Sequence, residues 1–134
     1  MEACRSAGTE IQFLLDAAKA SRIRKVVSCL ASATLRDPLA VGDIELAIGE
    51  AFSNAVKYGL GGKASMRIDI SEPENIAVEM TYPGKGFDTT VTYPDDAESG
   101  DGGFGRYIMH QILDKMDYYF EDGCTILSIS KHRP

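Results

Sequence analysis

The sequence predicts an α+β fold, a two-layer sandwich in which a mixed, mostly antiparallel sheet is covered on one face by three helices. Two patterns support this: segments in which apolar and polar residues alternate, as in half-buried strands, and segments with apolar residues at helical spacing. The expected strands lie at residues 10–15, 64–71, 76–82, 118–121 and 125–130, and the expected helices at residues 17–33, 44–58 and 103–116. Four of the five strands come as adjacent pairs separated by short turns, which favours antiparallel hairpins.

In the first half of the chain, one strand is followed by two helices. The first helix is interrupted at Asp37-Pro38, because proline ends a helical pattern. Asp43 is expected to cap the second helix, which runs to Tyr58. Gly59 then suits the left-handed position that ends many helices.

In the second half, two hairpins flank a third helix. The turn at residues 72–75 joins the first pair of strands, and Asp122-Gly123 joins the second. Residues 83–101 show no periodicity. The third helix is expected to run from about residue 103 to Met116, with an apolar face that includes Ile108 and Ile112. Tyr118, Tyr119 and Phe120 are interpreted as strand and core residues without a role in a site.

Composition restricts the possible functions. The 134 residues form one domain, 1–134, with 44% hydrophobic and 25% charged residues, as is typical of a soluble globular protein. The net charge of −6 argues against direct binding to nucleic acid or to an anionic membrane. Neither a membrane-spanning run nor a signal peptide is indicated, so we expect a cytoplasmic location. The three cysteines are far apart, and we expect them to be reduced.

One helical stripe combines three chemical groups. Glu50, Asn54 and Lys57 recur at i, i+4 and i+7 beside the apolar face of the second helix. A carboxylate, a carboxamide and an amine in one row can supply a base, a metal ligand and a phosphate contact. The alternative is a solvated helix flank held by weak charge pairs. Asn54 and Gly49 both lower helix propensity, which favours the functional interpretation.

Two glycine-rich segments give a second signal. Residues 83–87 leave a strand, and residues 102–105 enter a helix, where free backbone N–H groups attract phosphate. Glycines also cluster in ordinary loops, and neither segment fits a dinucleotide-binding or Walker pattern. Residues 88–101 between them are acidic and contain no lysine or arginine, which is typical of a solvated loop that could serve as a lid.

Together these segments resemble the GHKL ATPase/kinase fold of gyrase B, heat-shock chaperones, sensor histidine kinases and MutL. Within that superfamily the chain is most similar to the stand-alone anti-sigma-factor serine/threonine kinases. Residues 50–58 resemble the N box, residues 82–88 the first glycine box and residues 102–108 the second. Gly123-Cys124-Thr125 lies where the family usually has Gly-Thr on its last strand. The resemblance covers residues 10–131, and the three boxes in this order make it specific.

The resemblance implies a role for each matching residue, with ATP and Mg²⁺ as cofactors. Asn54 matches the asparagine that holds Mg²⁺ against the phosphates, and Glu50 matches the base toward the attacking hydroxyl. Lys57 matches a basic position near the phosphates, and Thr125 matches a threonine that seats the adenine through water. The glycines that present backbone to the nucleotide and hinge the lid correspond to Gly84, Gly86, Gly102, Gly103 and Gly105.

Tyr82 departs from the family pattern. It occupies the nucleotide-binding position where the first glycine box normally has an aspartate that accepts a hydrogen bond from the adenine amino group. Glu79 is not a substitute, because strand alternation directs it to the opposite sheet face. Losing a buried, charge-assisted hydrogen bond costs roughly 1.5–3 kcal/mol, about ten- to a hundred-fold in affinity.

Three functional hypotheses follow. In the first, the protein is an anti-sigma regulatory factor that binds a sigma factor and phosphorylates a serine or threonine of an anti-anti-sigma, STAS-type partner. In the second, it is a partner-sequestering module of the same fold that binds nucleotide weakly or not at all, because of Tyr82. In the third, it is the catalytic half of a split sensor histidine kinase. The resemblance also implies pairing as a homodimer.

Overall fold

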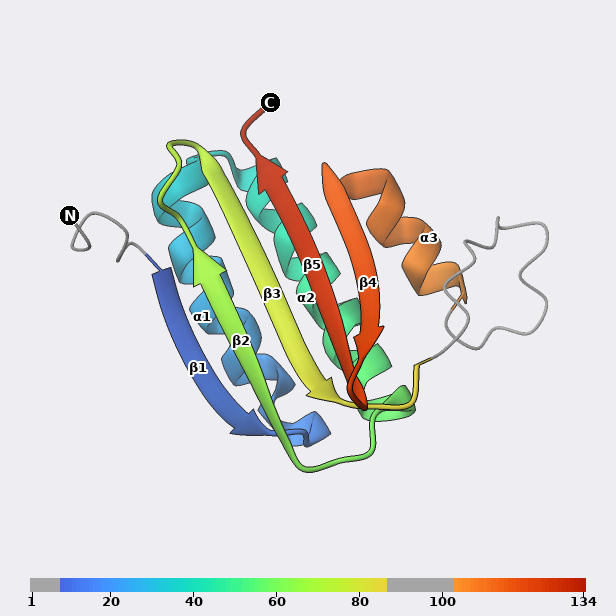
Figure 1. The fold of residues 1–134 in the computed structure, drawn as a ribbon. Coiled ribbons are helices and arrows are strands. Elements are labelled where there is room, and N and C mark those ends of the chain that lie inside the picture. The colour runs from blue at the N-terminus through green and yellow to red at the C-terminus, as the bar shows by residue number, and fades with distance from the viewer. Residues whose placement is uncertain (1–7, 87–102) are drawn as a thin grey trace.

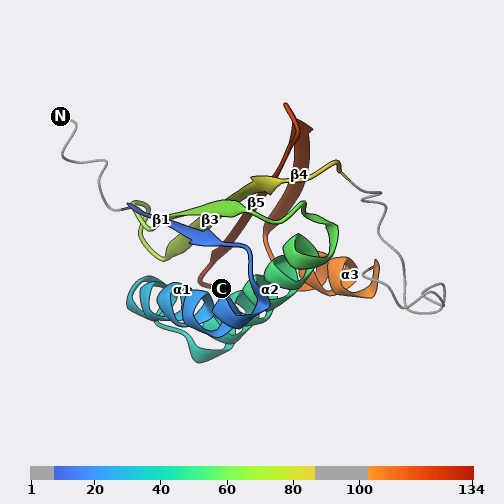
Figure 2. The same cartoon turned by 90° about the horizontal axis from the view of Figure 1, so that it is seen from below.

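The computed structural model describes residues 8–86 and 103–134, and it confirms the predicted fold class. Five strands form one sheet in the order β1-β2-β3-β5-β4, and every pairing is antiparallel. The helices cover one face of this sheet and leave the other face open (Figures 1 and 2). In chain order the elements are β1 (Gly8–Leu14), the short 3-10 helix η2 (Ala17–Lys19), α1 (Ala20–Leu35), α2 (Pro38–Tyr58), β2 (Lys63–Asp69), β3 (Asn75–Pro83), α3 (Gly103–Ile112), β4 (Lys115–Glu121) and β5 (Cys124–His132).

The core lies between the sheet and the helices. Alternate strand residues face inward, as the period of two in a strand requires, and they pack on α1 and α2. The fully buried strand residues include Met66, Ile68, Ile76, Met80, Leu127 and Ile129, and the buried helix residues include Val27, Leu35, Ile44, Ile48 and Phe52. Because α2 contributes buried residues along its whole length, its position relative to the sheet is fixed.

The start of α2 differs from the prediction. The helix begins at Pro38, and the side chain of Asp37 caps it by accepting a hydrogen bond of 3.3 Å from the backbone N–H of Leu39. Proline is favoured in a first helical turn because its fixed φ is already helical. The prediction that Asp43 caps the helix is therefore wrong. Asp43 lies inside α2, where its carboxylate forms an ion pair of 3.1 Å with Lys131.

The end of α2 is at Tyr58, as predicted, but Gly59 ends it in a different way. Gly59 has φ −78° and ψ 168°, which is extended and not left-handed backbone. Its N–H donates to the carbonyl of Ala55, and it forms an isolated antiparallel bridge with Gly84. The N–H of Leu60 also donates to the carbonyl of Pro83 at 2.9 Å. Backbone pairing with the end of β3 therefore takes the place of a left-handed cap.

Helix α3 is shorter than expected, because it ends at Ile112. Met116 belongs to β4, so the prediction that it continues the helix is wrong. The N–H of Asp114 donates to the carbonyl of Ser130, and β4 then pairs with β5 from Lys115 onward. Residue 116 therefore pairs in the sheet, although its spacing from Ile112 fits a helix.

Both hairpins are confirmed by antiparallel pairing of β2 with β3 and of β4 with β5. Asp122 and Gly123 have φ values of 55° and 75°, as a two-residue hairpin turn requires. Glu79 is exposed and Tyr82 is buried, so the two side chains lie on opposite sheet faces, as predicted. None of the helices within the described ranges is long and apolar enough to cross a membrane.

Candidate functional site

The three residues of the predicted stripe on α2 lie in different environments. Asn54 is buried, with 4% of its surface exposed, whereas Glu50 is half-buried and Lys57 is exposed. The Lys57 ammonium lies 5.3 Å from the ring centroid of Tyr58. A polar amide is rarely buried without a partner. Asn54 is therefore not part of a solvated flank, and the structure turns it toward the sheet.

The partner of Asn54 comes from β4. Its amide nitrogen Nδ2 donates to the phenol oxygen of Tyr118 at 3.3 Å, although the two residues are 64 positions apart. Tyr118 pairs with Leu127 and alternates with the exposed Tyr119, so it faces the helices. Tyr118 is not among the site residues that the sequence predicts. Strand alternation could have indicated its inward direction, but not the contact with Asn54.

The hydroxyl groups of Tyr82 and Thr125 form the other part of the site. The two residues pair across β3 and β5, and each is only 1% exposed. Within the described residues, Tyr82 Oη and Thr125 Oγ1 are buried and have no hydrogen-bond partner. A buried hydroxyl without a partner is destabilising, which makes this pair a place where a polar ligand edge could be accepted.

Tyr82 remains a neutral phenol. Burial raises its pKa well above the usual value, and the nearby phenol of Tyr118 raises it further. The Thr125 hydroxyl acts in the opposite direction, although it does not reach hydrogen-bond geometry with Tyr82. The position of the usual aspartate therefore carries no charge near neutral pH.

The first glycine box packs against side chains of this chain. A Cβ atom on Gly84 would lie 2.8 Å from Thr125 Oγ1, so a larger residue would clash there. Gly86 has φ +89°, which favours glycine, and a Cβ atom there would lie 3.2 Å from the ring of Phe120. Because neither glycine has a side chain, the segment after β3 can lie close to Thr125 of β5 and Phe120 of β4.

The second glycine box is described only in part. Gly103 and Gly105 lie in the first turn of α3. Gly102 and the predicted lid at residues 88–101 lie outside the described residues.

Glu50 lies beside a shallow groove between α1 and α2. This groove has a volume of about 510 Å³ and is lined by Arg24, Gly42, Glu45, Leu46, Gly49, Glu50 and Ser53. The guanidinium of Arg24 lies 3.4 Å from the position that a Cβ on Gly49 would take. Glu50 and Asn54 are one helical turn apart, but Glu50 borders α1 while Asn54 contacts β4. The carboxylate therefore remains accessible from the groove.

The donor set can be compared with what a nucleotide and its cation require. Within the described ranges, no group of three or more His, Cys, Asp and Glu residues could hold a metal by itself. A cation near Asn54 would therefore need phosphate oxygens as further ligands, as Mg²⁺ commonly does. Asn54 Nδ2 is engaged by Tyr118, which leaves the amide oxygen as an available ligand. The residues thus fit a magnesium-bound nucleotide at its phosphate end, and at the base end they offer two neutral hydroxyls.

Comparisons with known proteins identify the family of this chain. A family model described as "Histidine kinase-like ATPase domain" matches residues 13–131. Two similar solved structures are the histidine kinase domain of the blue-light activated histidine kinase EL346 from Erythrobacter litoralis and the histidine kinase AdeS from Acinetobacter baumannii. Their TM-scores are 0.55 and 0.53, and they are 18% and 15% identical to this chain. The alignments cover 90% and 91% of this chain, but only 61% and 67% of those structures. At this identity the likeness concerns the fold alone. A search of curated proteins finds no match.

Proposed function

This chain belongs to the histidine kinase-like ATPase domain family, and we propose that it is an anti-sigma regulatory factor. In this proposal it uses ATP and Mg²⁺ to phosphorylate a serine or threonine of an anti-anti-sigma, STAS-type partner. The observation that carries the proposal is the state of Asn54, which is buried, has its amide nitrogen engaged, and lies one helical turn from the accessible carboxylate of Glu50. The proposal includes binding to a sigma factor, a cytoplasmic location and pairing as a homodimer, without direct contact to nucleic acid or membrane.

Asn54, Glu50 and Lys57 would each have a different role in phosphoryl transfer. The bound nucleotide supplies the phosphoryl group, and the reaction mainly needs alignment and neutralisation of charge. The amide oxygen of Asn54 would hold the cation. Glu50 would accept the proton of the attacking hydroxyl, and the groove between α1 and α2 gives the partner access to it. The exposed Lys57 lies one turn after Asn54 and would offset negative charge near the phosphates.

A second candidate function is favoured by one observation. The ring of Tyr82 is almost fully buried at the position where the family has its adenine-binding aspartate. A phenol is larger than a carboxylate and would occupy space next to the base of a bound nucleotide. The second candidate is therefore a module that sequesters its partner by surface contact and needs no nucleotide.

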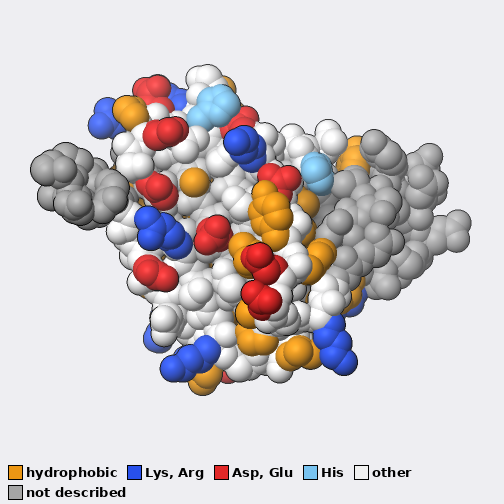
Figure 3. All heavy atoms as spheres, viewed as in Figure 1, with side chains coloured by type: hydrophobic (Ala, Val, Ile, Leu, Met, Phe, Trp, Pro, Cys, Tyr) orange, Lys and Arg blue, Asp and Glu red, His pale blue; other side chains and the backbone are white. Residues whose placement is uncertain are grey.

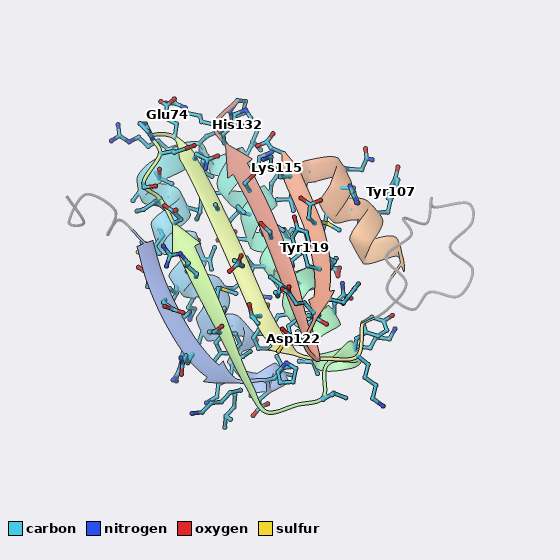
Figure 4. The ribbon with its side chains drawn as sticks, viewed as in Figure 1. Glu74, Tyr107, Lys115, Tyr119, Asp122 and His132 are labelled. Carbon is cyan, nitrogen blue, oxygen red and sulfur yellow. The ribbon has the colours of Figure 1, made fainter. Side chains whose placement is uncertain are left out.

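The deciding experiment is a calorimetric titration with Mg-ATP and with Mg-ADP. The native chain, Tyr82→Asp and the control Tyr119→Asp would be compared, because Tyr119 is an exposed tyrosine on the open face of β4 (Figure 4). Binding by the native chain supports the kinase. Binding that appears only in Tyr82→Asp supports the nucleotide-independent module. If none of the three chains binds nucleotide, the assignment of a nucleotide site is refuted.

A further inference from the structure

The side-chain amide of Asn54 has two chemically different ends, and one of them contacts Tyr118. Nδ2 can only donate, and Oδ1 can only accept a hydrogen bond or bind a cation. The structure directs Nδ2 of Asn54 toward the phenol oxygen of Tyr118 at 3.3 Å. Because Nδ2 and Oδ1 point in different directions from the amide carbon, Oδ1 does not face the phenol oxygen of Tyr118. The orientation of the only amide in the predicted stripe is thus set by a residue outside the three boxes.

The ring of Tyr118 packs against neighbouring side chains. Its ring stacks on Phe120 with a centroid distance of 6.3 Å and an interplanar angle of 7°. It also packs against the hydrophobic core from the inner face of β4. Phe120 in turn lies against the Cβ position of Gly86. Tyr118 therefore contacts both Asn54 on α2 and Phe120, the residue that lies beside Gly86.

We propose that Tyr118 is a positioning residue for Asn54, and that its phenol oxygen fixes the amide so that Oδ1 faces a nucleotide-bound divalent cation. This inference rests on the proposed function, because it requires a cation at Asn54. Partners that orient a metal ligand typically contribute ten- to a hundred-fold to metal affinity. The opposite arrangement is chemically distinct: a phenol that donated its proton to Oδ1 would compete with the cation instead of assisting it.

The test compares the dissociation constant of ATP with Mg²⁺ and with EDTA, for the native chain and for Tyr118→Phe. The dissociation constant in EDTA divided by the dissociation constant with Mg²⁺ is the ratio that measures how much the cation contributes to binding. Tyr118→Phe keeps the stacked ring and removes only the hydroxyl. We expect the ratio to fall roughly tenfold in this variant, while the constant in EDTA stays unchanged. A merely structural role for Tyr118 would change both constants together.

Two controls make the result specific. Tyr119→Phe removes the same hydroxyl from the opposite sheet face, where the side chain is 53% exposed (Figure 4), and it should leave the ratio unchanged. In an Asn54→Ala background, Tyr118→Phe should have no further effect on the ratio, because the amide that it positions is absent.

The inference and the proposed function can fail separately. If the native chain binds Mg-ATP and Tyr118→Phe keeps or raises the ratio, the inference is overturned while the nucleotide site stands. A raised ratio would show that the hydroxyl competes with the cation. If neither the native chain nor Tyr82→Asp binds nucleotide, the proposed function fails, and the inference is overturned with it.

Discussion

Tyr82 and Thr125 lie side by side on β3 and β5 with both hydroxyls buried, and within the described residues neither hydroxyl has a hydrogen-bond partner. Leaving a buried hydroxyl unsatisfied costs about 1–3 kcal/mol. Two such groups in adjacent positions are unusual for a core that exists only to be stable. We therefore expect each of these hydroxyls to lower the stability of the fold without nucleotide.

The first prediction concerns stability without nucleotide. Tyr82→Phe should raise the free energy of unfolding by about 1 kcal/mol, because the ring still fills its site and the unsatisfied hydroxyl is gone. Urea denaturation monitored by circular dichroism measures this change. Tyr119→Phe, on the exposed face of β4, should change stability by less than about 0.5 kcal/mol. A loss of stability in Tyr82→Phe would mean that the phenol is hydrogen-bonded in solution.

The second prediction concerns alkaline pH. Burial raises the pKa of Tyr82 in the folded protein above the unfolded-state value of about 10, so the folded state holds the phenol proton more tightly. The resulting stabilisation is fully present below about pH 10 and is lost as pH rises toward the folded pKa. The native chain should therefore lose stability between about pH 10 and 11 more steeply than Tyr82→Phe. Equal slopes for the two chains in denaturant titrations would contradict this.

The third prediction tests Glu50 as the base. Under the proposed function, Glu50→Gln should lower phosphate transfer from ATP to an anti-anti-sigma protein by about 10²–10⁴-fold, which is the usual contribution of a general base. Glu45→Gln is the matched control, because Glu45 lines the same groove but accepts a hydrogen bond from Ser28. Transfer of labelled phosphate measures the rate. The assignment of Glu50 fails if its variant transfers phosphate as fast as the native chain does.

The fourth prediction concerns Lys131, which connects three elements. Its ammonium forms an ion pair of 3.1 Å with Asp43 of α2 and donates at 2.7 Å to the carbonyl of Ile112 at the end of α3. Because the side chain is only 14% exposed, Lys131→Met should lower the free energy of unfolding by about 1–3 kcal/mol. Thermal denaturation of this variant and of Lys63→Met, an exposed control, would show whether the effect is specific.

The fifth prediction separates two glycines. Gly84→Ala should destabilise the fold by about 1–3 kcal/mol, because the new methyl group would lie 2.8 Å from Thr125 Oγ1. Gly42→Ala should instead stabilise it by up to about 1 kcal/mol, because Gly42 lies inside α2 with open space around it. Chemical denaturation of both variants checks the difference. Equal effects of the two substitutions would show that Gly84 is not tightly packed.

The sequence was sufficient to predict the fold class, the end of α2 and both hairpins, because these features depend on local signals. Asp122-Gly123 is one example, since its turn requires two positive φ values. The start of α2 is predicted too late because Asp37-Pro38 is interpreted only as the end of the first helix, whereas these two residues are the N-cap and the first residue of α2. Met116 continued a helical pattern, but pairing with β5 determined its structure.

The candidate site was less predictable than the fold. The sequence places Asn54 in a polar stripe beside the apolar face of α2, so its burial is not predicted, whereas the burial of Tyr82 follows from strand alternation. The contact between Asn54 and Tyr118 depends on how a helix and an edge strand meet, and no local pattern contains that information. For the same reason the sequence could not show that Thr125 and Tyr82 both lack partners among the described residues.

The open face of the sheet contrasts with this enclosed site. Acidic, basic and hydrophobic side chains are interspersed over it (Figure 3). Tyr119, Lys115 and His132 all project from this side of the molecule (Figure 4). Substitutions such as Tyr119→Phe therefore serve as controls that leave the helix-facing chemistry undisturbed.

The backbone bonds between α2 and β3 have a consequence for local unfolding. Gly59 bridges Gly84, and the N–H of Leu60 donates to Pro83, so the last turn of the helix cannot fray without separating from the strand. Segments joined in this way open as one cooperative unit. In native-state hydrogen exchange, the amide protons of Gly59 and Leu60, which are bonded to Ala55 and Pro83, should therefore exchange with a common free energy of opening. The N box and the first glycine box would then be a single element of stability, although the chain between them forms two strands.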